Sequence, residues 1–286
     1  MTKVSFQGVS GSYSEEAIRG FFNIDLESVA CNMLEDVFST VEAGDVEYGI
    51  LPVENAVAGS VARSYELLLD HDLTIYAEVI LRVRHMLMVN PGTKYSDLKQ
   101  ARSHPQALAQ CHRYLVRHQL EPVPAFDTAG SSSDLAANPD KTTAVIASAL
   151  AAELYGLEII DRDIEDFPFN YTRFFLLSKE AAPHAQRNKT SLIFTTPHQP
   201  GVLYECLGEF AKRNINLTKI ESRPRLNKPW QYIFYLDFEG HSKDPKSEAA
   251  ILGLLRRASF VKLLGSYQAA TTPFNENELT THFSGD

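Results

Sequence analysis

The sequence predicts an α/β protein with a larger two-lobed unit followed by a small unit of βαββαβ order. Short apolar strands alternate with amphipathic helices from residue 3 to about 180, which is typical of a parallel sheet covered by helices. Long crossings near residues 73–90 and 157–175 indicate two lobes joined by two connections, with a cleft between them. A polar stretch at 181–189, which contains Pro183, reads as the linker to the small unit.

Each element of the first unit follows from its apolar spacing. Ile18, Phe21 and Phe22 share one helical face, and residues 48–53 form a short apolar run that is typical of a buried strand. We expect strands at residues 3–8, 48–53, 123–126, 143–148 and 173–177, and helices at 13–22, 61–69, 106–117 and 149–155. Residues 73–89 read as a long strand that crosses between lobes. Lobe one then takes about 1–76 and 160–180, and lobe two about 77–159, within a first domain at 1–180.

The second unit, residues 190–270, has the same kind of signals. A strand at 190–195 precedes a helix from Gly201 to Asn214 and a strand at 216–223. A turn at 227–229 leads to a strand with Trp230, Tyr232, Phe234, Leu236 and Phe238 on one face. A helix around 251–258 and a strand at 261–268 follow, and 271–286 is a polar tail. This order predicts a ferredoxin-like antiparallel sheet with two helices on one side, a small domain of a kind that often pairs with a copy.

Composition excludes several classes of function. The 286 residues carry a net charge of −9 without a Lys/Arg cluster, so neither nucleic acid nor an anionic membrane surface is an expected partner. The first six residues lack the features of a signal peptide, and no apolar run approaches the ~20 residues of a membrane span. Cys31, Cys111 and Cys206 are far apart and odd in number, so we expect buried thiols and a cytoplasmic location.

Polar residues gather where the predicted strands end and helices begin, which is where parallel α/β sheets bind ligands. Four such junctions stand out: Gln7–Ser14 with its two glycines, Glu54 and Asn55 before Gly59-Ser60, Ser103–Gln106 with Gln110, and the small-residue loop Asp127–Ser133. Ordinary turns and helix caps explain each of these alone equally well or better.

Thr172-Arg173-Phe174 begins the last strand of the first unit. Because side chains alternate along a strand, Thr172 and Phe174 face one way and Arg173 the other. A surface arginine after a turn is the ordinary reading of Arg173. The sequence lacks a phosphate-binding Gly-x-x-x-x-Gly-Lys-Ser/Thr loop, a His-Glu-x-x-His segment and a Gly-x-Ser-x-Gly elbow. No nucleotide cofactor or metal is therefore expected.

The segment Glu221-Ser222-Arg223-Pro224 lies in an irregular strand. Ile215 and Leu217 share a face with Lys219, Glu221 and Arg223, which mixes apolar and charged side chains. This pattern predicts a bulge or an interface, although a solvated strand end with a charged pair is the simpler alternative.

Taken together, the motifs resemble those of prephenate dehydratases over nearly the whole chain. The matching segments are Gly8-x-x-Gly11-x-Tyr13-Ser14, Pro52-Val53-Glu54-Asn55, Ser103-His104-Pro105-Gln106, Asp127-Thr128-Ala129-Gly130 and Thr172-Arg173-Phe174, in this order. Residues from about 190 to 269 resemble the regulatory ACT domain of these enzymes, with Gly201-Val202-Leu203 and Glu221–Pro224 as its phenylalanine-binding segments.

The resemblance implies a two-lobed, periplasmic-binding-protein-like catalytic domain that converts prephenate to phenylpyruvate without a cofactor. It assigns the proton donor to Thr172, although Glu54, if buried and neutral, is a better acid. The remaining catalytic positions that it implies are Asn55, Ser103 and Gln110. The substrate-binding positions that it implies are Arg173, Phe174, Ser14, Ser60, Thr128, Ala129 and Gly130.

Regulation also follows from the resemblance, and two alternative functions stay open. It implies that L-phenylalanine binds where two ACT domains meet, at Gly201, Val202, Leu203, Glu221, Ser222, Arg223 and Pro224, in a homodimer or homotetramer. Arogenate dehydratase is an alternative of the same class. A non-enzymatic small-molecule binding protein is the alternative from another class, because two-lobed α/β clefts also serve simple ligand capture.

Overall fold

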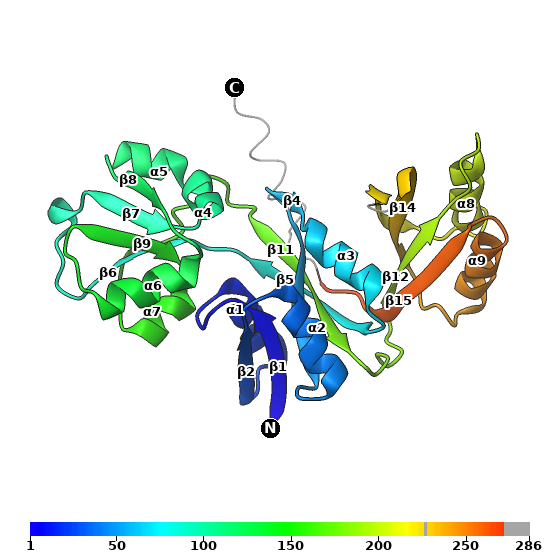
Figure 1. The fold of residues 1–286 in the computed structure, drawn as a ribbon, viewed down its shortest axis with the longest axis horizontal. Helices are drawn as coiled ribbons and strands as arrows, with labels where there is room; N and C mark the ends of the chain where they lie inside the picture. Colours follow the sequence, from blue (N-terminus) through cyan, green and yellow to red (C-terminus); the bar gives the residue numbers. More distant parts are fainter. Residues whose placement is uncertain (226–227, 272–286) are drawn as a thin grey trace.

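The computed structural model describes residues 1–225 and 228–271, without the side chains of residues 225–231. Three sheets lie in a row, with lobe one in the middle, lobe two on one side of it and the C-terminal domain on the other (Figure 1). The α/β class with a two-lobed first unit is confirmed. None of the helices in the described ranges combines the length and apolar character needed to cross a membrane.

Lobe one has the strand order β2-β1-β3-β11-β5, with β4 paired to β3. Strand β11 runs antiparallel to both neighbours, whereas β1 is parallel to β2 and β3. The strands are β1 (Thr2–Gln7), β2 (Leu26–Cys31), β3 (Tyr48–Asn55), β4 (Gly59–Ser60), β5 (Thr74–Arg82) and β11 (Tyr171–Ser178). Its helices are α1 (Tyr13–Phe22), α2 (Leu34–Ala43) and α3 (Ala62–Asp70). Strand β2 and helix α2 were not predicted from the sequence. Strand β2 is an edge strand with little apolar alternation, so its sequence pattern is weak.

Lobe two has the strand order β10-β6-β9-β7-β8. The strands are β6 (Met86–Val89), β7 (Gln100–Ser103), β8 (Glu121–Pro124), β9 (Thr143–Ala147) and β10 (Glu158–Asp161). The helices are η1 (Tyr95–Asp97), α4 (Pro105–Gln110), α5 (His112–Arg117), α6 (Thr128–Ala137) and α7 (Ala149–Tyr155). Segments 83–85 and 162–170 connect the lobes. The predicted strand at 73–89 is thus two strands in different lobes, and lobe one extends to Arg82 rather than to residue 76.

Two further predictions for lobe two are wrong. The expected loop at Asp127–Ser133 is the start of helix α6, where the Asp127 carboxylate caps the helix by accepting the Gly130 N–H. The Ser131 hydroxyl donates to the Asp127 carbonyl oxygen, so a serine that would favour a loop is satisfied within the helix. The expected helix at 106–117 is interrupted at Cys111 and forms α4 and α5.

The C-terminal domain confirms the ferredoxin-like prediction. Its strands pair antiparallel in the order β13-β14-β12-β15. The elements are β12 (Asn188–Thr195), α8 (Val202–Ala211), β13 (Leu217–Arg225), β14 (Lys228–Glu239), α9 (Pro245–Leu255) and β15 (Phe260–Gln268). Residue 227 of the predicted turn, the side chain of Trp230 and the predicted tail beyond Thr271 lie outside the described residues.

One continuous hydrophobic core joins lobe one to the C-terminal domain. It contains Leu51, Val53 and Phe175 from the lobe-one sheet together with Tyr235 and Tyr267 from the small domain, all nearly inaccessible to solvent. At Gly265 the backbone of β15 approaches β5 so closely that a Cβ atom would lie 2.6 Å from the Ile75 carbonyl oxygen. The two parts therefore pack directly against each other.

Candidate active site

A cavity of about 250 Å³ lies between lobe one and lobe two. Lobe one contributes residues from α1, β3 and β11, lobe two contributes residues from α4 and α6, and the crossing segment 83–85 contributes Val83 and His85. The lining side chains are Tyr13, Ser14, Pro52, Asn55, Val83, His85, His104, Gln106, Ala107, Gln110, Asp127, Thr128, Thr172 and Phe174.

The electrostatic character of this cavity comes from helix ends and amides rather than from basic side chains. First-turn residues of three helices, Ser14 of α1, Gln106 of α4 and Thr128 of α6, line it. Ser12, His104 and the Asp127 carboxylate each cap one N–H group of these turns, and the N–H groups left uncapped favour a bound anion. Lysine and arginine are missing from the lining described here. An anionic ligand in this cavity would therefore be held by N–H groups and hydroxyls.

Strands β3 and β11 place the polar groups of the cavity floor. Their antiparallel register sets Thr172 opposite Asn55 and Arg173 opposite Glu54. Alternation then directs the Asn55 and Thr172 side chains into the cavity and the other pair to the opposite face of the sheet. The register shifts between Arg173 and Phe174, where Val53 is the extra residue. This bulge keeps both Pro52 and Asn55 on the cavity face.

The Asn55 amide sets the direction of the hydrogen bond to Thr172. Its carbonyl oxygen accepts the backbone N–H groups of Val57 and Ala58 at 3.0 and 2.8 Å. Its N–H₂ group must therefore face Thr172, whose hydroxyl oxygen lies 2.9 Å away and accepts the bond. The hydroxyl hydrogen of Thr172 finds no acceptor within residues 1–225 and 228–271 and is free to donate to a ligand in the cavity.

A buried chain of amides continues from this point. Asn55 also donates to Asn170 Oδ1 at 2.7 Å, and Asn170 Nδ2 lies 3.0 Å from Gln110 Oε1. Asn170 is 1% exposed and belongs to the second crossing segment, so the chain ties β3 of lobe one to α4 of lobe two. Asn170 was not predicted from sequence, although it stands directly before the strand that carries Thr172.

Comparison with known proteins agrees with this geometry. The family model described as prephenate dehydratase matches residues 4–182, which is more than half of the chain, and the ACT domain model matches residues 190–256. The chain belongs to the prephenate dehydratase family. It is 42% identical over 281 residues to arogenate dehydratase/prephenate dehydratase 2 of Arabidopsis thaliana, which covers 94% of this chain and 74% of that protein.

Two solved structures resemble this one over nearly the full length of both chains. The prephenate dehydratase of Arthrobacter aurescens in complex with L-Phe has a TM-score of 0.86 and 29% identity, and the match covers 99% of this chain and 97% of that one. GqqA, described as a novel type of quorum quenching acylase, has a TM-score of 0.87 and 34% identity, with coverage of 94% and 98%.

The site residues that the family resemblance implies divide into those that line the cavity and those that do not. The first group lines the cavity and comprises Ser14, Asn55, Gln110, Thr128, Thr172 and Phe174. Ser103 lies outside the lining, since its buried hydroxyl donates to the Ile146 carbonyl oxygen at 2.6 Å. Ala129 and Gly130 continue helix α6 behind Thr128 and also lie outside the lining. The expected substrate contacts of these three residues are therefore not supported.

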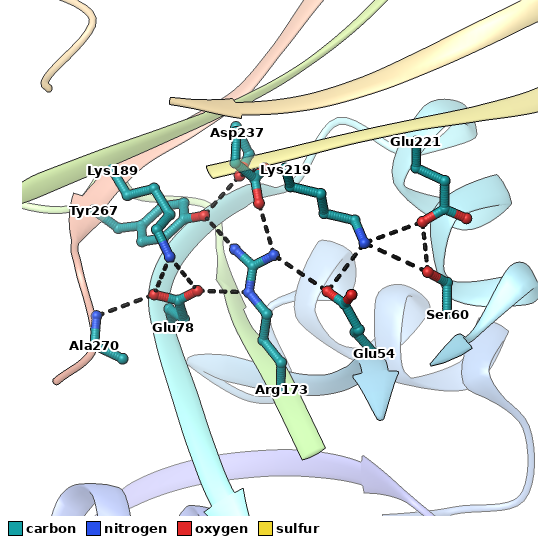
Figure 2. A network of polar contacts seen from close by, with 11 residues as sticks. Glu54, Ser60, Glu78, Arg173, Lys189, Lys219, Glu221, Asp237, Tyr267 and Ala270 are labelled. Carbon is teal, nitrogen blue, oxygen red and sulfur yellow. Dashed lines mark hydrogen bonds and ion pairs between the residues drawn. The ribbon is translucent and has the colours of Figure 1, made fainter. Parts of the chain in front are cut away.

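Arg173 and Glu54 require a larger correction, because their side chains face the ACT domain. Arg173 pairs with Glu78 at 2.5 Å and with Asp237 of β14 at 2.6 Å (Figure 2). Glu54 lies 3.0 Å from Lys219 of β13 and 3.8 Å from Arg173, with its side chain 38% exposed. Neither residue lines the cavity, so Arg173 does not hold a substrate carboxylate here, and Glu54 does not meet the condition of burial under which it would be the better acid.

Ser60 takes part in the same contact between lobe one and the ACT domain. Its hydroxyl donates to the Glu221 carboxylate at 2.5 Å, and Lys219 lies 3.1 Å from that carboxylate (Figure 2). Burial alone would raise the pKa of Glu221, but Ser60, Lys219 and Arg223 hold it below its usual value. Ser60 therefore binds the ACT domain rather than lining the cavity, and the Glu221 segment is an interface with lobe one.

The predicted phenylalanine-binding segments lie on two faces of the ACT sheet. Glu221 and Arg223 face lobe one, whereas Ser222 and Pro224 alternate with them and are exposed. Gly201 and Leu203 line a separate hollow at the start of α8, with Tyr232 and Phe234 of β14. In the register, Ser222 pairs with Phe234 and Pro224 with Tyr232, which places these residues beside the hollow. Val202 starts helix α8 next to it.

The irregularity predicted in this strand is confirmed. The register of β13 with β14 shifts between Leu217 and Lys219, so Thr218 is an extra residue in the strand. The bulge turns Lys219 toward lobe one. Across the described residues, no grouping of three or more His, Cys, Asp or Glu side chains has the geometry to hold a metal ion.

Proposed function

We propose that this member of the prephenate dehydratase family removes water and carbon dioxide from prephenate in the cavity between its lobes. The observation that carries the proposal is the Thr172 hydroxyl, which accepts from Asn55 at 2.9 Å and keeps its own hydrogen for the ligand. A hydroxyl oriented by an amide donor suits hydrogen-bond donation to a leaving group. A nucleophilic hydroxyl would instead need a base as its partner.

The reaction needs such a donor. The bond between the ring and its carboxylate breaks, its electron pair enters the ring, and the ring hydroxyl leaves from the opposite carbon. Carbon dioxide, water and the aromatic ring of phenylpyruvate result, and one proton is taken up by the leaving oxygen. A hydrogen bond from Thr172 that strengthens as charge develops on that oxygen lowers the barrier.

The two carboxylates of prephenate meet different walls of the cavity. The first turns of α1 and α6, at Ser14 and Thr128, offer N–H groups and hydroxyls to the pyruvyl carboxylate. Val83, Ala107 and Phe174 are apolar residues of the lining, and beside such residues a poorly solvated ring carboxylate would lose carbon dioxide more readily. Substrate binding thus needs no basic side chain in this cavity.

A direct assay tests the proposed reaction. The purified protein should convert prephenate to phenylpyruvate, measured by its absorbance in alkali, and arogenate should be tested in parallel because named relatives act as arogenate dehydratases. An acylated quorum-sensing signal should be included because GqqA is described as a quorum quenching acylase. Turnover of prephenate at the highest kcat/KM supports the proposal. Turnover of arogenate or the acylated signal alone would replace it.

We further propose that L-phenylalanine binds at the hollow beside Gly201 and lowers activity. The structure of the Arthrobacter aurescens relative contains L-Phe, and the hollow here has a volume of about 280 Å³ between Leu203, Tyr232 and Phe234. Exposed Ser222 and Pro224 on edge strand β13 are placed for contact with a second ACT domain in a homodimer or homotetramer. Phenylalanine should slow the reaction and raise the melting temperature. An effect on neither would refute this role.

A further inference from the structure

Tyr13 and His85 line the cavity but have no role in the reaction as described so far. Tyr13 begins helix α1 in lobe one, and His85 lies in the first crossing segment. The Tyr13 hydroxyl oxygen lies 2.7 Å from His85 Nδ1, and His85 Nε2 lies 2.8 Å from Gln110 Oε1. Because His85 is only 2% exposed, these bonds are shielded from water and link α1 to α4.

The directions of these bonds follow from the backbone at the far end of the amide chain. The N–H groups of Val57 and Ala58 fix the Asn55 carbonyl oxygen, so Asn55 donates from Nδ2. Asn170 accepts that bond at Oδ1, which turns its own N–H₂ group toward Gln110. Gln110 Oε1 therefore receives the hydrogen bond from Asn170 at 3.0 Å.

The hydrogen-bonded tautomer of His85 is also determined. A carbonyl oxygen only accepts hydrogen bonds, so the hydrogen in the 2.8 Å contact must sit on His85 Nε2. Burial lowers the pKa of His85, and it raises the pKa of Tyr13 well above its usual value. The ring is thus neutral with Nδ1 as an acceptor, and the Tyr13 hydroxyl donates to it at 2.7 Å in preference to the Arg84 carbonyl oxygen, which lies 3.0 Å away.

Gln110 is left with one orientation. Its carbonyl oxygen is occupied by donors from His85 and Asn170, so its N–H₂ group points away from both, and Gln110 itself lines the cavity. None of the residues that the structure describes accepts a hydrogen bond from this group. It is therefore available to an oxygen atom of the substrate.

We propose that His85, in the Nε2–H tautomer and supported by Tyr13, is a positioning residue that keeps the Gln110 N–H₂ group directed at the bound substrate. Without the donor on His85, Asn170 alone would hold the Gln110 carbonyl oxygen, and the amide would direct its N–H₂ group at an anionic ligand less firmly. This inference rests on the proposed function, because it requires an oxygen-rich anion in the cavity.

Two substitutions of similar polarity separate positioning from simple packing. His85→Gln keeps an N–H donor near the place of Nε2, whereas His85→Asn reaches only the place of Nδ1. We expect His85→Asn to raise KM by about 10- to 100-fold, the effect of losing a hydrogen bond to a charged group, with a smaller change in kcat. His85→Gln should restore most of the loss. Equal losses in both variants would overturn the proposal.

A double variant tests whether His85 acts through Gln110. In a Gln110→Ala background, His85→Asn should cause little further loss of kcat/KM, because the group that it positions is already gone. Multiplication of the two losses would show that His85 acts independently and would overturn the proposal. Melting temperatures of all variants establish that folded proteins are being compared.

The tautomer can be measured in the unmodified protein, which keeps the proposal testable if the variants fold poorly. Long-range ¹H–¹⁵N correlation spectra of the full chain should show His85, among the nine histidines, as neutral with its hydrogen on Nε2, and its signal is assigned through its contact with the Tyr13 ring rather than through a variant. A hydrogen on Nδ1 would contradict the proposal whether or not prephenate is turned over. Absence of turnover of any tested substrate would instead refute the proposed function.

Discussion

The Asn55 side-chain amide lies 2.9 Å from the Thr172 hydroxyl oxygen, across the paired strands β3 and β11. Because the Asn55 carbonyl oxygen is held by the backbone N–H groups of Val57 and Ala58, only its N–H₂ group can face Thr172. The fold thereby assigns Thr172 the part of acceptor toward the protein and donor toward the ligand. This polarity gives the first prediction.

Asn55→Asp should abolish that polarity while changing few atoms. The new carboxylate can still accept from the backbone, but it cannot donate to Thr172, whose hydrogen would turn toward it and away from the ligand. We expect kcat to fall by about 10²- to 10³-fold, as when one positioned donor is removed from an active site. The same change at exposed Asn138 is the control and should leave kcat unaltered.

Glu54→Gln should have a small effect on the basal reaction. The Glu54 carboxylate faces Lys219 and Arg173 outside the cavity, and a partly exposed ion pair contributes at most about 1 kcal/mol. Steady-state kinetics without phenylalanine should therefore show a kcat within about fivefold of the unmodified protein and an unchanged pH profile. Loss of more than a hundredfold with loss of one limb of the pH profile would return Glu54 to the catalytic machinery.

Glu78 is expected to make stability depend on pH. It is 4% exposed, and although burial alone would raise its pKa, Arg173 and Lys189 hold it below its usual value. A carboxyl with a lowered pKa in the folded state stabilises the fold above its unfolded-state pKa of about 4.3. That contribution is lost as the pH falls through the folded-state pKa.

Urea denaturation of Glu78→Gln measures this contribution. At pH 7 the variant should be less stable by about 3–5 kcal/mol, because two cations lose a buried partner. Below about pH 4 the difference should shrink, since the protonated carboxyl of the unmodified protein resembles the amide. Glu27→Gln removes the exposed partner of Lys3 and should change little at either pH. A difference for Glu78→Gln that stays constant with pH would contradict the assignment.

Gly265 should tolerate no side chain. It has a φ of +151°, and a Cβ atom there would lie 2.6 Å from the Ile75 carbonyl oxygen in lobe one. Gly265→Ala should lower the melting temperature by several degrees, because the ACT sheet and strand β5 must move apart. Gly208→Ala in helix α8, where a Cβ meets open space, should raise stability by about 0.5–1 kcal/mol. The opposite order would show that the two domains do not pack as described.

The sequence predicted the main parts of this site because short-range patterns govern them. Strand alternation separates Thr172 from Arg173, and turn and cap signals mark the junctions at Ser14 and Thr128. Local pattern does not reveal which face of the sheet holds the cavity and which holds the ACT domain. That choice depends on packing between distant segments, and it moved Glu54 and Arg173 out of the site.

The roles that were missed belong to residues joined by long-range contacts, although Tyr13 itself stood in a predicted junction. Tyr13, His85 and Asn170 come from three separate parts of the chain and meet only when the lobes pack. His85 carries no distinctive local signal, since Glu78, Arg82 and Arg84 also interrupt the apolar run at 73–89. Asn170 carries none either, because an asparagine before a strand is an ordinary loop residue.

The central claim is that the Thr172 hydroxyl donates a hydrogen bond to the leaving oxygen, and the kinetics of Thr172→Val and Thr172→Ser with prephenate test it most directly. Valine keeps the shape without the hydroxyl, whereas serine keeps the hydroxyl. We expect Thr172→Val to lower kcat by about 10²- to 10⁴-fold with little change in KM, and Thr172→Ser to retain most of the activity. Equal and mild effects of both substitutions on kcat would contradict the claim.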